Sequence, residues 1–241
     1  MGGDDVVLEV RRISKQYGGL RPLRMEHLKV RRGESVAIVG VDLPAAQVLV
    51  DLLTGASVPD TGDIMVFGQP TEAIVDGDAW LTFLDHFGIL SARAVLLDAL
   101  TVEQNLAVPF SLRLNPIPED VRAQLAMLAS EVGLGPDVLS RPVSATTPDV
   151  RLRVRLARAV ALRPHLLLAE HPNALAEAAA LSNFAADFRA LVAARGLTSL
   201  TLTADESYAA SVATRVLTLA PATGVLGEKR GWKDRLVRWA R

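Results

Sequence analysis

The sequence predicts an α/β fold, and three observations support this prediction. The chain has 241 residues, of which 50% are hydrophobic and only 5% aromatic, enough for a large core of Ala, Val and Leu. Short runs rich in β-branched residues recur with turn residues around them, and helical apolar patterns lie between most of these runs. Because strands that alternate with helices usually pair in parallel, a parallel sheet is expected. The expected strands are Val6 to Val10, Ser35 to Gly40, Asp63 to Phe67, His165 to Ala169, Thr198 to Thr203 and Arg215 to Leu219.

One strand, turn and helix near the N-terminus have the form of a phosphate-binding loop. The strand SVAIVG ends in glycine, and the segment AAQVLVDLLTG reads as a helix, with Pro44 suited to its first turn. Such a loop normally holds several glycines, a lysine for the outer phosphates and a Ser or Thr hydroxyl for magnesium. The segment from Gly40 to Gln47 instead reads GVDLPAAQ. The scaffold is present, but most of its chemical groups differ.

The middle of the chain breaks the alternation of strands and helices. From about Thr101 to Leu162 the sequence predicts three helices and no strand, which indicates a helical insertion within the α/β domain. Further along, Leu181, Phe184, Phe188, Leu191 and Val192 form an apolar stripe that ends near Arg195 and Gly196, where glycine suits a helix C-cap. The three helices expected in the insertion are Val102 to Leu112, Pro118 to Val132 and Pro148 to Leu162.

Charge and composition exclude several classes of function. With 26 Lys and Arg against 27 Asp and Glu, the net charge is −1, so general affinity for nucleic acid is not expected. The absence of cysteine excludes disulfides, thiolate metal sites and cysteine nucleophiles. The start MGGDDVV lacks the basic residues of a signal peptide, and no apolar run has the roughly 18 to 20 residues of a membrane span. A cytoplasmic protein that is not inserted in a bilayer is expected.

The last 14 residues, 228–241, form a basic amphipathic tail. Trp232, Leu236 and Trp239 fall on one helical face, and Lys and Arg outnumber the acids around them. This pattern suits peripheral contact with a membrane interface, and packing of the two tryptophans onto the domain is the equal alternative.

Four stretches make the chain resemble the nucleotide-binding subunit of an ATP-binding-cassette (ABC) transporter, from about Val7 to Leu219. They are SKQYGG, RRGESVAIVG, LARAVALRPHLLLAEHP and LTADESYAASVATRVLTL. The resemblance implies the P-loop NTPase-like ABC fold, with a mixed sheet, an antiparallel β portion near the N-terminus and a helical subdomain at about 93–162. The nucleotide-binding domain would then span 1–227, followed by the tail. Tyr17 stands where the family stacks adenine on an aromatic ring.

At nearly every functional position of that family the residue is altered. Of the loop glycines only Gly40 remains, and Thr146 to Val150 stand in place of the signature LSGGQ. By the resemblance, Ala46 replaces the phosphate-loop lysine, Gln47 the magnesium-binding hydroxyl, Ala92 the glutamine, Glu170 the magnesium-binding aspartate, His171 the glutamate base and Ala204 the switch histidine.

These losses predict negligible ATP hydrolysis. A charge pair near 4 Å is worth about 4 kcal/mol at an effective dielectric of roughly 20, so loss of the lysine alone weakens triphosphate binding severely. Asp42 adds a carboxylate to the same loop. No catalytic residue, metal site or cofactor is therefore expected. Tyr17, Gly40 and Gln47 would form at best a vestigial nucleotide site.

The expected function is a non-hydrolysing scaffold or regulatory subunit that docks on a membrane permease at the inner face of the cell membrane. The resemblance implies a dimer with a second nucleotide-binding subunit, identical or different, and VEQNLAVPF resembles cassettes of lipid and lipoprotein trafficking. One alternative is an atypical active ABC ATPase that binds Mg-ATP with Tyr17, Gln47, Glu170 and His171. Another is a nucleic-acid- or ribosome-associated cassette protein, for which Arg151, Arg155 and Arg158 share one helical face.

Overall fold

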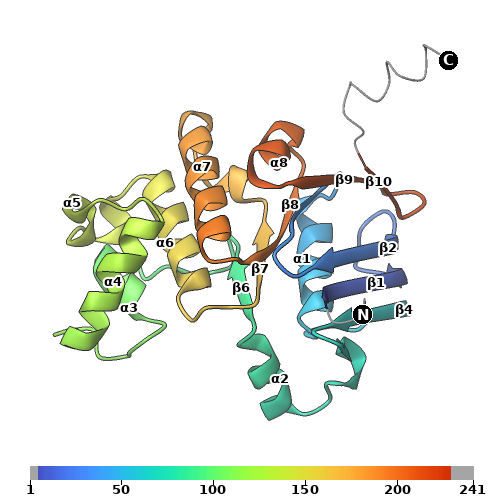
Figure 1. The fold of residues 1–241 in the computed structure, drawn as a ribbon, viewed down its shortest axis with the longest axis horizontal. Helices are drawn as coiled ribbons and strands as arrows, with labels where there is room; N and C mark the ends of the chain where they lie inside the picture. The colour runs from blue at the N-terminus through green and yellow to red at the C-terminus, as the bar shows by residue number, and fades with distance from the viewer. Residues whose placement is uncertain (1–4, 229–241) are drawn as a thin grey trace.

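Two β-sheets and a set of helices make up the computed structural model, which describes residues 5–228 (Figure 1). The predicted tail residues Trp232, Leu236 and Trp239 lie outside the described residues. The strands are β1 Val6–Lys15, β2 Leu23–Arg31, β3 Ser35–Val39, β4 Thr61–Val66, β5 Gln69–Pro70, β6 Phe87–Leu90, β7 Leu166–Glu170, β8 Thr198–Thr203, β9 Arg215–Ala220 and β10 Val225–Glu228. The α-helices are α1 Leu43–Leu53, α2 Gly77–Leu84, α3 Val102–Ala107, α4 Glu119–Glu131, α5 Pro136–Leu139, α6 Pro148–Val160, α7 Ala178–Ala194 and α8 Glu206–Val212.

The larger sheet is mixed, as expected. Its strand order is β10-β9-β3-β8-β7-β6, and the strands from β9 to β6 pair in parallel while β10 pairs antiparallel with β9. The smaller sheet, β2-β1-β4-β5, is antiparallel throughout, which confirms an antiparallel portion near the N-terminus. Because β3, β8 and β7 run in parallel, their carboxyl ends share one edge of the sheet.

Three short 3-10 helices complete the described chain, at Thr71–Ala73, Val143–Ala145 and Pro172–Leu175. The predicted strands all form. β8 has the predicted bounds, and the other five differ by one or more residues at one or both ends. The pattern missed β2, β5, β6, β10, α2, α5 and α8, most of which are too short for a clear period. The helix expected at 102–112 was predicted too long, because Pro109 has no N–H to continue it and α3 ends at Ala107.

Two apolar clusters hold these layers together. One lies between the two sheets and α1, and includes Leu49 and Leu53 of that helix. The other joins α3, α4 and α6 to α7, around Phe184 and Phe188, and so fixes the helical segment against the α/β core. Figure 1 shows the consequence: α3 to α6 lie at one side of the larger sheet, and the small sheet lies at the other. Among residues 5–228, none of the helices combines the length and apolar character needed to cross a bilayer.

Candidate functional site

The candidate site lies at the carboxyl edge of the larger sheet, where β3 leads into α1 and β7 ends at Glu170. Gly40 makes the turn between β3 and α1 with a φ of +88°. A Cβ atom at this position would lie 2.7 Å from the carbonyl oxygen of Leu219, so only glycine allows β3 to pass this close to β9. The packing of β3 against β9 therefore requires glycine at position 40, whether or not the loop binds a ligand.

Asp42 caps the N-terminus of α1 with its own carboxylate. Its Oδ1 accepts a hydrogen bond of 2.8 Å from the backbone N–H of Ala45, and its carbonyl accepts one of 2.9 Å from Ala46. Pro44 supplies no N–H, and its position in the first turn is as predicted. Backbone N–H groups at a helix N-terminus are what a phosphate loop offers to a ligand. In this helix, a side chain of the chain itself already accepts from one of them.

We expect the change Asp42→Ala to lower the free energy of unfolding by about 1 kcal/mol, because it removes the N-cap of α1. The change Asp42→Asn keeps an oxygen that accepts from Ala45 and serves as the matched control. Urea unfolding followed by circular dichroism measures both. Equal stability of the alanine variant and the parent would show that the cap does not hold the helix.

The positions expected to be vestigial lie in α1 or beside it. Ala46 is fully buried in the cluster between the sheets, so the position of the family's lysine is part of the core. Gln47 is half-buried, and its side chain makes no hydrogen bond within residues 5–228. The predicted strand, turn and helix are confirmed, and the Ala46 side chain in this segment is positioned by packing.

Tyr17 lines a pocket of about 460 Å³ beside the loop, together with Gly40, Asp42 and Pro44. The ring is partly buried, and a Cβ atom on Gly19 would lie 2.8 Å from it, so Tyr17 packs against its own loop. Burial and, second, the Asp42 carboxylate raise the pKa of the Tyr17 hydroxyl. The structure brings Tyr17 and Gly40 to one pocket, whereas Gln47 does not line it; the charged lining residues are Asp42, Arg21 and Arg24.

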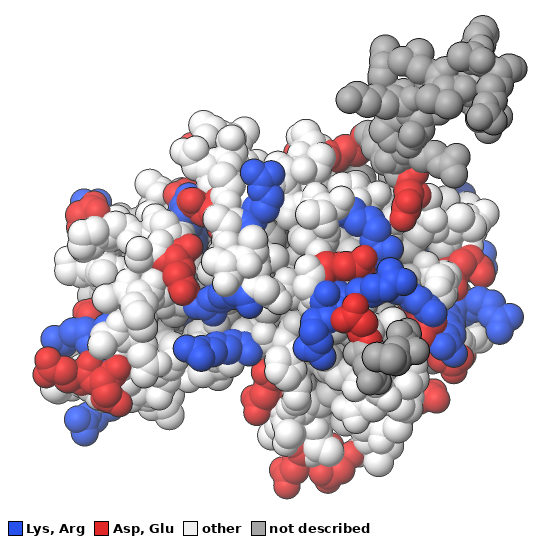
Figure 2. All heavy atoms as spheres, in the orientation of Figure 1, with Lys and Arg blue, Asp and Glu red and all other residues white. Residues whose placement is uncertain are grey.

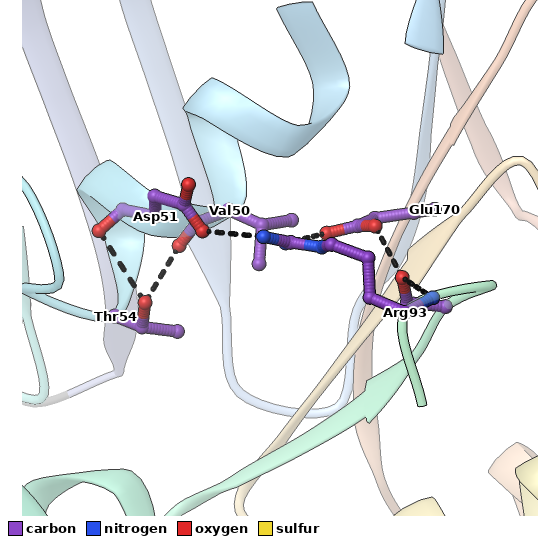
Figure 3. A network of polar contacts seen from close by, with 6 residues as sticks. Val50, Asp51, Thr54, Arg93 and Glu170 are labelled. Carbon is purple, nitrogen blue, oxygen red and sulfur yellow. Dashed lines mark hydrogen bonds and ion pairs between the residues drawn. The ribbon is translucent and has the colours of Figure 1, made fainter. Parts of the chain in front are cut away.

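Arg93 occupies the space between β7 and α1 (Figure 3). Its guanidinium hydrogen-bonds Glu170 through Nη2, and its Nη1 donates to Asp51 of α1 at 2.9 Å. The Ser91 hydroxyl donates to the second oxygen of Glu170 at 2.5 Å. The Glu170 side chain is 1% exposed, so its charge is buried and is balanced by Arg93.

The electrostatics of Arg93 follow from these contacts. Partial burial by itself would lower the pKa of the guanidinium, but the hydrogen bonds to Glu170 and Asp51 outweigh burial and raise the pKa. Both oxygens of Glu170 accept from the chain's own donors. The carboxylate expected at the magnesium position is therefore already engaged by a cation and a hydroxyl.

The network of Ser91, Arg93, Glu170 and Asp51 was not predicted from the sequence. In the segment 91–93 only Ala92 was assigned a role, as the position of the family's glutamine. A signal was present in the sequence: Arg93 directly follows the lost glutamine, while Glu170 and Asp51 are acids in the elements that meet this segment. Only the tertiary structure places these charges within contact.

His171 and Ala204 do not join Glu170 in a common cluster. His171 is buried, and its backbone is in the left-handed conformation with a φ of +43°. The Nε2 atom of its side chain has no hydrogen-bond partner within residues 5–228. Ala204 is exposed in the turn before α8 and carries no polar side chain. Within the same residues, no group of His, Asp and Glu has the geometry to hold a metal ion.

The altered signature segment forms the start of α6. Thr147 is the N-cap residue, and Pro148 occupies the first turn. Asp149 accepts from Arg153 Nε at 3.1 Å, and Arg153 also bonds Asp187 of α7 at 2.6 Å. Both helices thus carry a carboxylate at the N-terminal end, Asp42 as the N-cap residue of α1 and Asp149 in the first turn of α6.

Arg151, Arg155 and Arg158 make contacts within the chain. Arg155 Nε donates to the carbonyl of Ala94 at 3.1 Å, and Arg158 Nη1 donates to that of Val95 at 2.7 Å. Arg151 bonds the carbonyls of the segment before α6. The three arginines that share this helical face thus bond backbone carbonyls, and Arg155 and Arg158 brace the segment that carries Arg93.

No family model matches this chain. Among curated proteins, it is 29% identical over 177 residues to the lipoprotein-releasing system ATP-binding protein LolD of Alcanivorax borkumensis, covering 72% of the chain and 77% of that relative. It is 27% identical over 213 residues to the methionine import ATP-binding protein MetN of Brucella abortus, covering 88% of the chain. The chain spans 57% of the length of MetN.

Among solved structures, cbiO1 from Clostridium perfringens, described as part of the ABC transporter complex cbiONQ, matches with a TM-score of 0.78 and 20% identity. The match covers 98% of the chain and 92% of cbiO1. A dimeric ATP-binding cassette in a post-hydrolysis state, bound to ADP and Pi, matches with a TM-score of 0.74 and 18% identity, over 93% of the chain and 100% of that structure.

The fold is thus that of an ABC nucleotide-binding domain, with a mixed α/β sheet and an antiparallel N-terminal sheet. In sequence and fold, the chain is a relative of the ATP-binding subunits of ABC transporters.

Proposed function

We propose that this chain is a non-hydrolysing ABC-type subunit that acts as a scaffold or regulatory subunit docked on a membrane permease. One observation carries the proposal: the chain's own side chains engage the groups that would otherwise receive Mg-ATP. The Asp42 carboxylate accepts from the N-terminus of α1, and the Arg93 guanidinium lies against Glu170. Bound Mg-ATP would place phosphates beside the carboxylate and a divalent cation beside the guanidinium.

Both juxtapositions are electrostatically unfavourable. Two like charges about 4 Å apart repel by about 4 kcal/mol at an effective dielectric of roughly 20, and the compensating lysine position is Ala46 in the core. The residues present therefore do not fit Mg-ATP. The site is held by contacts within the chain, which suits a subunit whose geometry does not depend on nucleotide.

The docking surface we propose is the groove between the larger sheet and the helical segment. This groove has a volume of about 330 Å³ and is lined by Phe87 and Ile89 of β6, by Val108 and by Leu162. The residues Val95 and Leu162 are 71% and 60% exposed. An apolar groove with exposed apolar side chains beside it suits a short helix of a permease.

The relatives named above serve two different processes, lipoprotein release and methionine import, and therefore do not agree on one substrate. The substrate class that we propose for the permease, lipids or lipoproteins, rests instead on the VEQNLAVPF segment. By analogy with the relatives, we propose a dimer with a second nucleotide-binding subunit and a location at the inner face of the membrane.

Calorimetric titration with Mg-ATP tests the proposal. We expect no binding up to roughly 1 mM, which corresponds to a binding free energy weaker than about −4 kcal/mol, and no phosphate release above that of buffer. Micromolar binding with turnover would contradict the proposal. If that turnover were lost in Glu170→Ala and in His171→Ala, the chain would be an atypical active ATPase.

A further inference from the structure

A second pocket lies at the opposite edge of the larger sheet, at the amino ends of β7 and β8. It has a volume of about 450 Å³ and is lined by residues from three turns. Arg32 comes from the turn between β2 and β3, Arg163 and His165 from the turn between α6 and β7, and Arg195 from the turn between α7 and β8. The pocket is thus remote in the fold from the site at the carboxyl edge.

The carbonyl groups at the two helix ends beside this pocket are already satisfied. The carbonyl of Val160, at the end of α6, accepts from Arg195 Nη1 at 2.5 Å and from the backbone N–H of Arg163 at 3.2 Å. At the end of α7, the N–H groups of Gly196 and Leu197 donate to carbonyls of the last turn at 3.1 and 2.9 Å. The lining cations are therefore not all needed to cap helices.

The charge balance of the pocket is positive. Its only acidic lining residue, Glu131, forms an ion pair with Arg195. Within residues 5–228, the guanidinium groups of Arg32 and Arg163 form neither an ion pair nor a hydrogen bond. Figure 2 shows this face of the molecule, where Lys and Arg side chains lie below the end of α7 and beside β1 and β2. Two unpaired cations thus remain at the pocket.

The pKa of the His165 imidazole reflects the positive electrostatic potential at the pocket. Burial, then the neighbouring His86 and then Arg32 lower the pKa of the His165 imidazole. The two imidazole rings lie 4.9 Å apart, and the backbone N–H of His165 donates to the carbonyl of His86 at 2.8 Å. Arg32 is therefore close enough to His165 to disfavour a further positive charge. An anion would relieve that repulsion.

Arg163 is held in an unusual backbone conformation. Its φ is +55°, three residues after α6 ends at Val160. A residue with a Cβ atom rarely adopts this left-handed conformation. Strained positions of this kind gather at ligand sites, because the surrounding structure holds the side chain where binding needs it.

We propose that this pocket binds a phosphate-bearing small molecule through the guanidinium groups of Arg32 and Arg163, with His165 beside them. Planar guanidinium groups match phosphate oxygens with paired, charge-assisted hydrogen bonds. The pocket volume falls in the range of small-molecule sites, which are about 300 to 1,000 Å³. The site is independent of the proposed scaffold function, because it uses neither the phosphate loop nor the docking groove.

Calorimetric titration of the full chain with sodium pyrophosphate at low ionic strength tests the proposal. We expect binding that weakens about tenfold in Arg32→Gln and in Arg163→Gln, the loss expected for one charge-assisted hydrogen bond. Arg113→Gln removes an exposed arginine elsewhere and should leave affinity unchanged. Absence of pyrophosphate binding, or equal affinity in all three variants, would overturn the proposal.

NMR of the histidine side chains gives a second readout, because nearby phosphate charge should raise the pKa of His165. The resonance is assigned with His165→Gln. Vesicles of phosphatidylcholine with phosphatidylglycerol distinguish a lipid phosphate from a soluble one. Vesicle binding that depends on Arg32 and Arg163, without pyrophosphate binding, would contradict a soluble ligand.

Discussion

Replacing Arg93 by alanine is expected to lower the free energy of unfolding by about 3 kcal/mol, because it leaves the Glu170 carboxylate buried without a cation. The Glu170 side chain is 1% exposed, whereas that of Arg93 is 42% exposed. We therefore expect the low end of the cost of breaking a buried ion pair, since Ser91 still donates to Glu170. Urea unfolding measures the difference.

The double variant Arg93→Ala with Glu170→Gln separates the charge from the packing. It removes the buried charge together with its partner, so most of the lost stability should return. The matched control Arg113→Ala deletes an exposed arginine, and a change within about 0.5 kcal/mol is expected. A double variant as unstable as Arg93→Ala would show that the stem of Arg93, and not its charge, holds this region.

Truncation of Phe188 should have the largest effect, a loss of about 4 kcal/mol of stability. Phe184 and Phe188 are fully buried, with ring centroids 6.2 Å apart, in the cluster that joins α7 to α3, α4 and α6. The change Phe188→Ala leaves a cavity that rigid neighbouring elements can fill only in part. Total stabilities of domains are about 5 to 15 kcal/mol, so this one change would remove a large share.

Chemical unfolding compares Phe188→Ala with a change at the apolar residue Leu112, which is 91% exposed. The change Leu112→Ala should alter stability by less than about 0.5 kcal/mol. A loss below about 1 kcal/mol for Phe188→Ala would show that the helical segment is not held to α7 by this cluster.

The two ion pairs of Arg153, with Asp149 and Asp187, show which contacts of the helical segment cannot be predicted from the sequence. The sequence predicted a helix from Pro148 to Leu162, where α6 forms. It gave no partner for this arginine, because Asp187 lies 34 positions away on α7. Helical periodicity indicates which residues share a face, but the contact between two helices depends on how the connecting turns are packed.

The sequence by itself determined the α/β class and the turn from β3 to α1 around Gly40, because these depend on local pattern and residue identity. Short elements such as β6 and α8 were not predicted from the sequence, because β6 is defined by its pairing with β7 and α8 by its packing on β3. The tertiary structure alone decided that Arg93 balances Glu170 and Asp51, and that Arg32 and Arg163 meet at one pocket. Charges far apart in the chain interact only once the sheet has brought their turns together, and no period in the sequence encodes that distance.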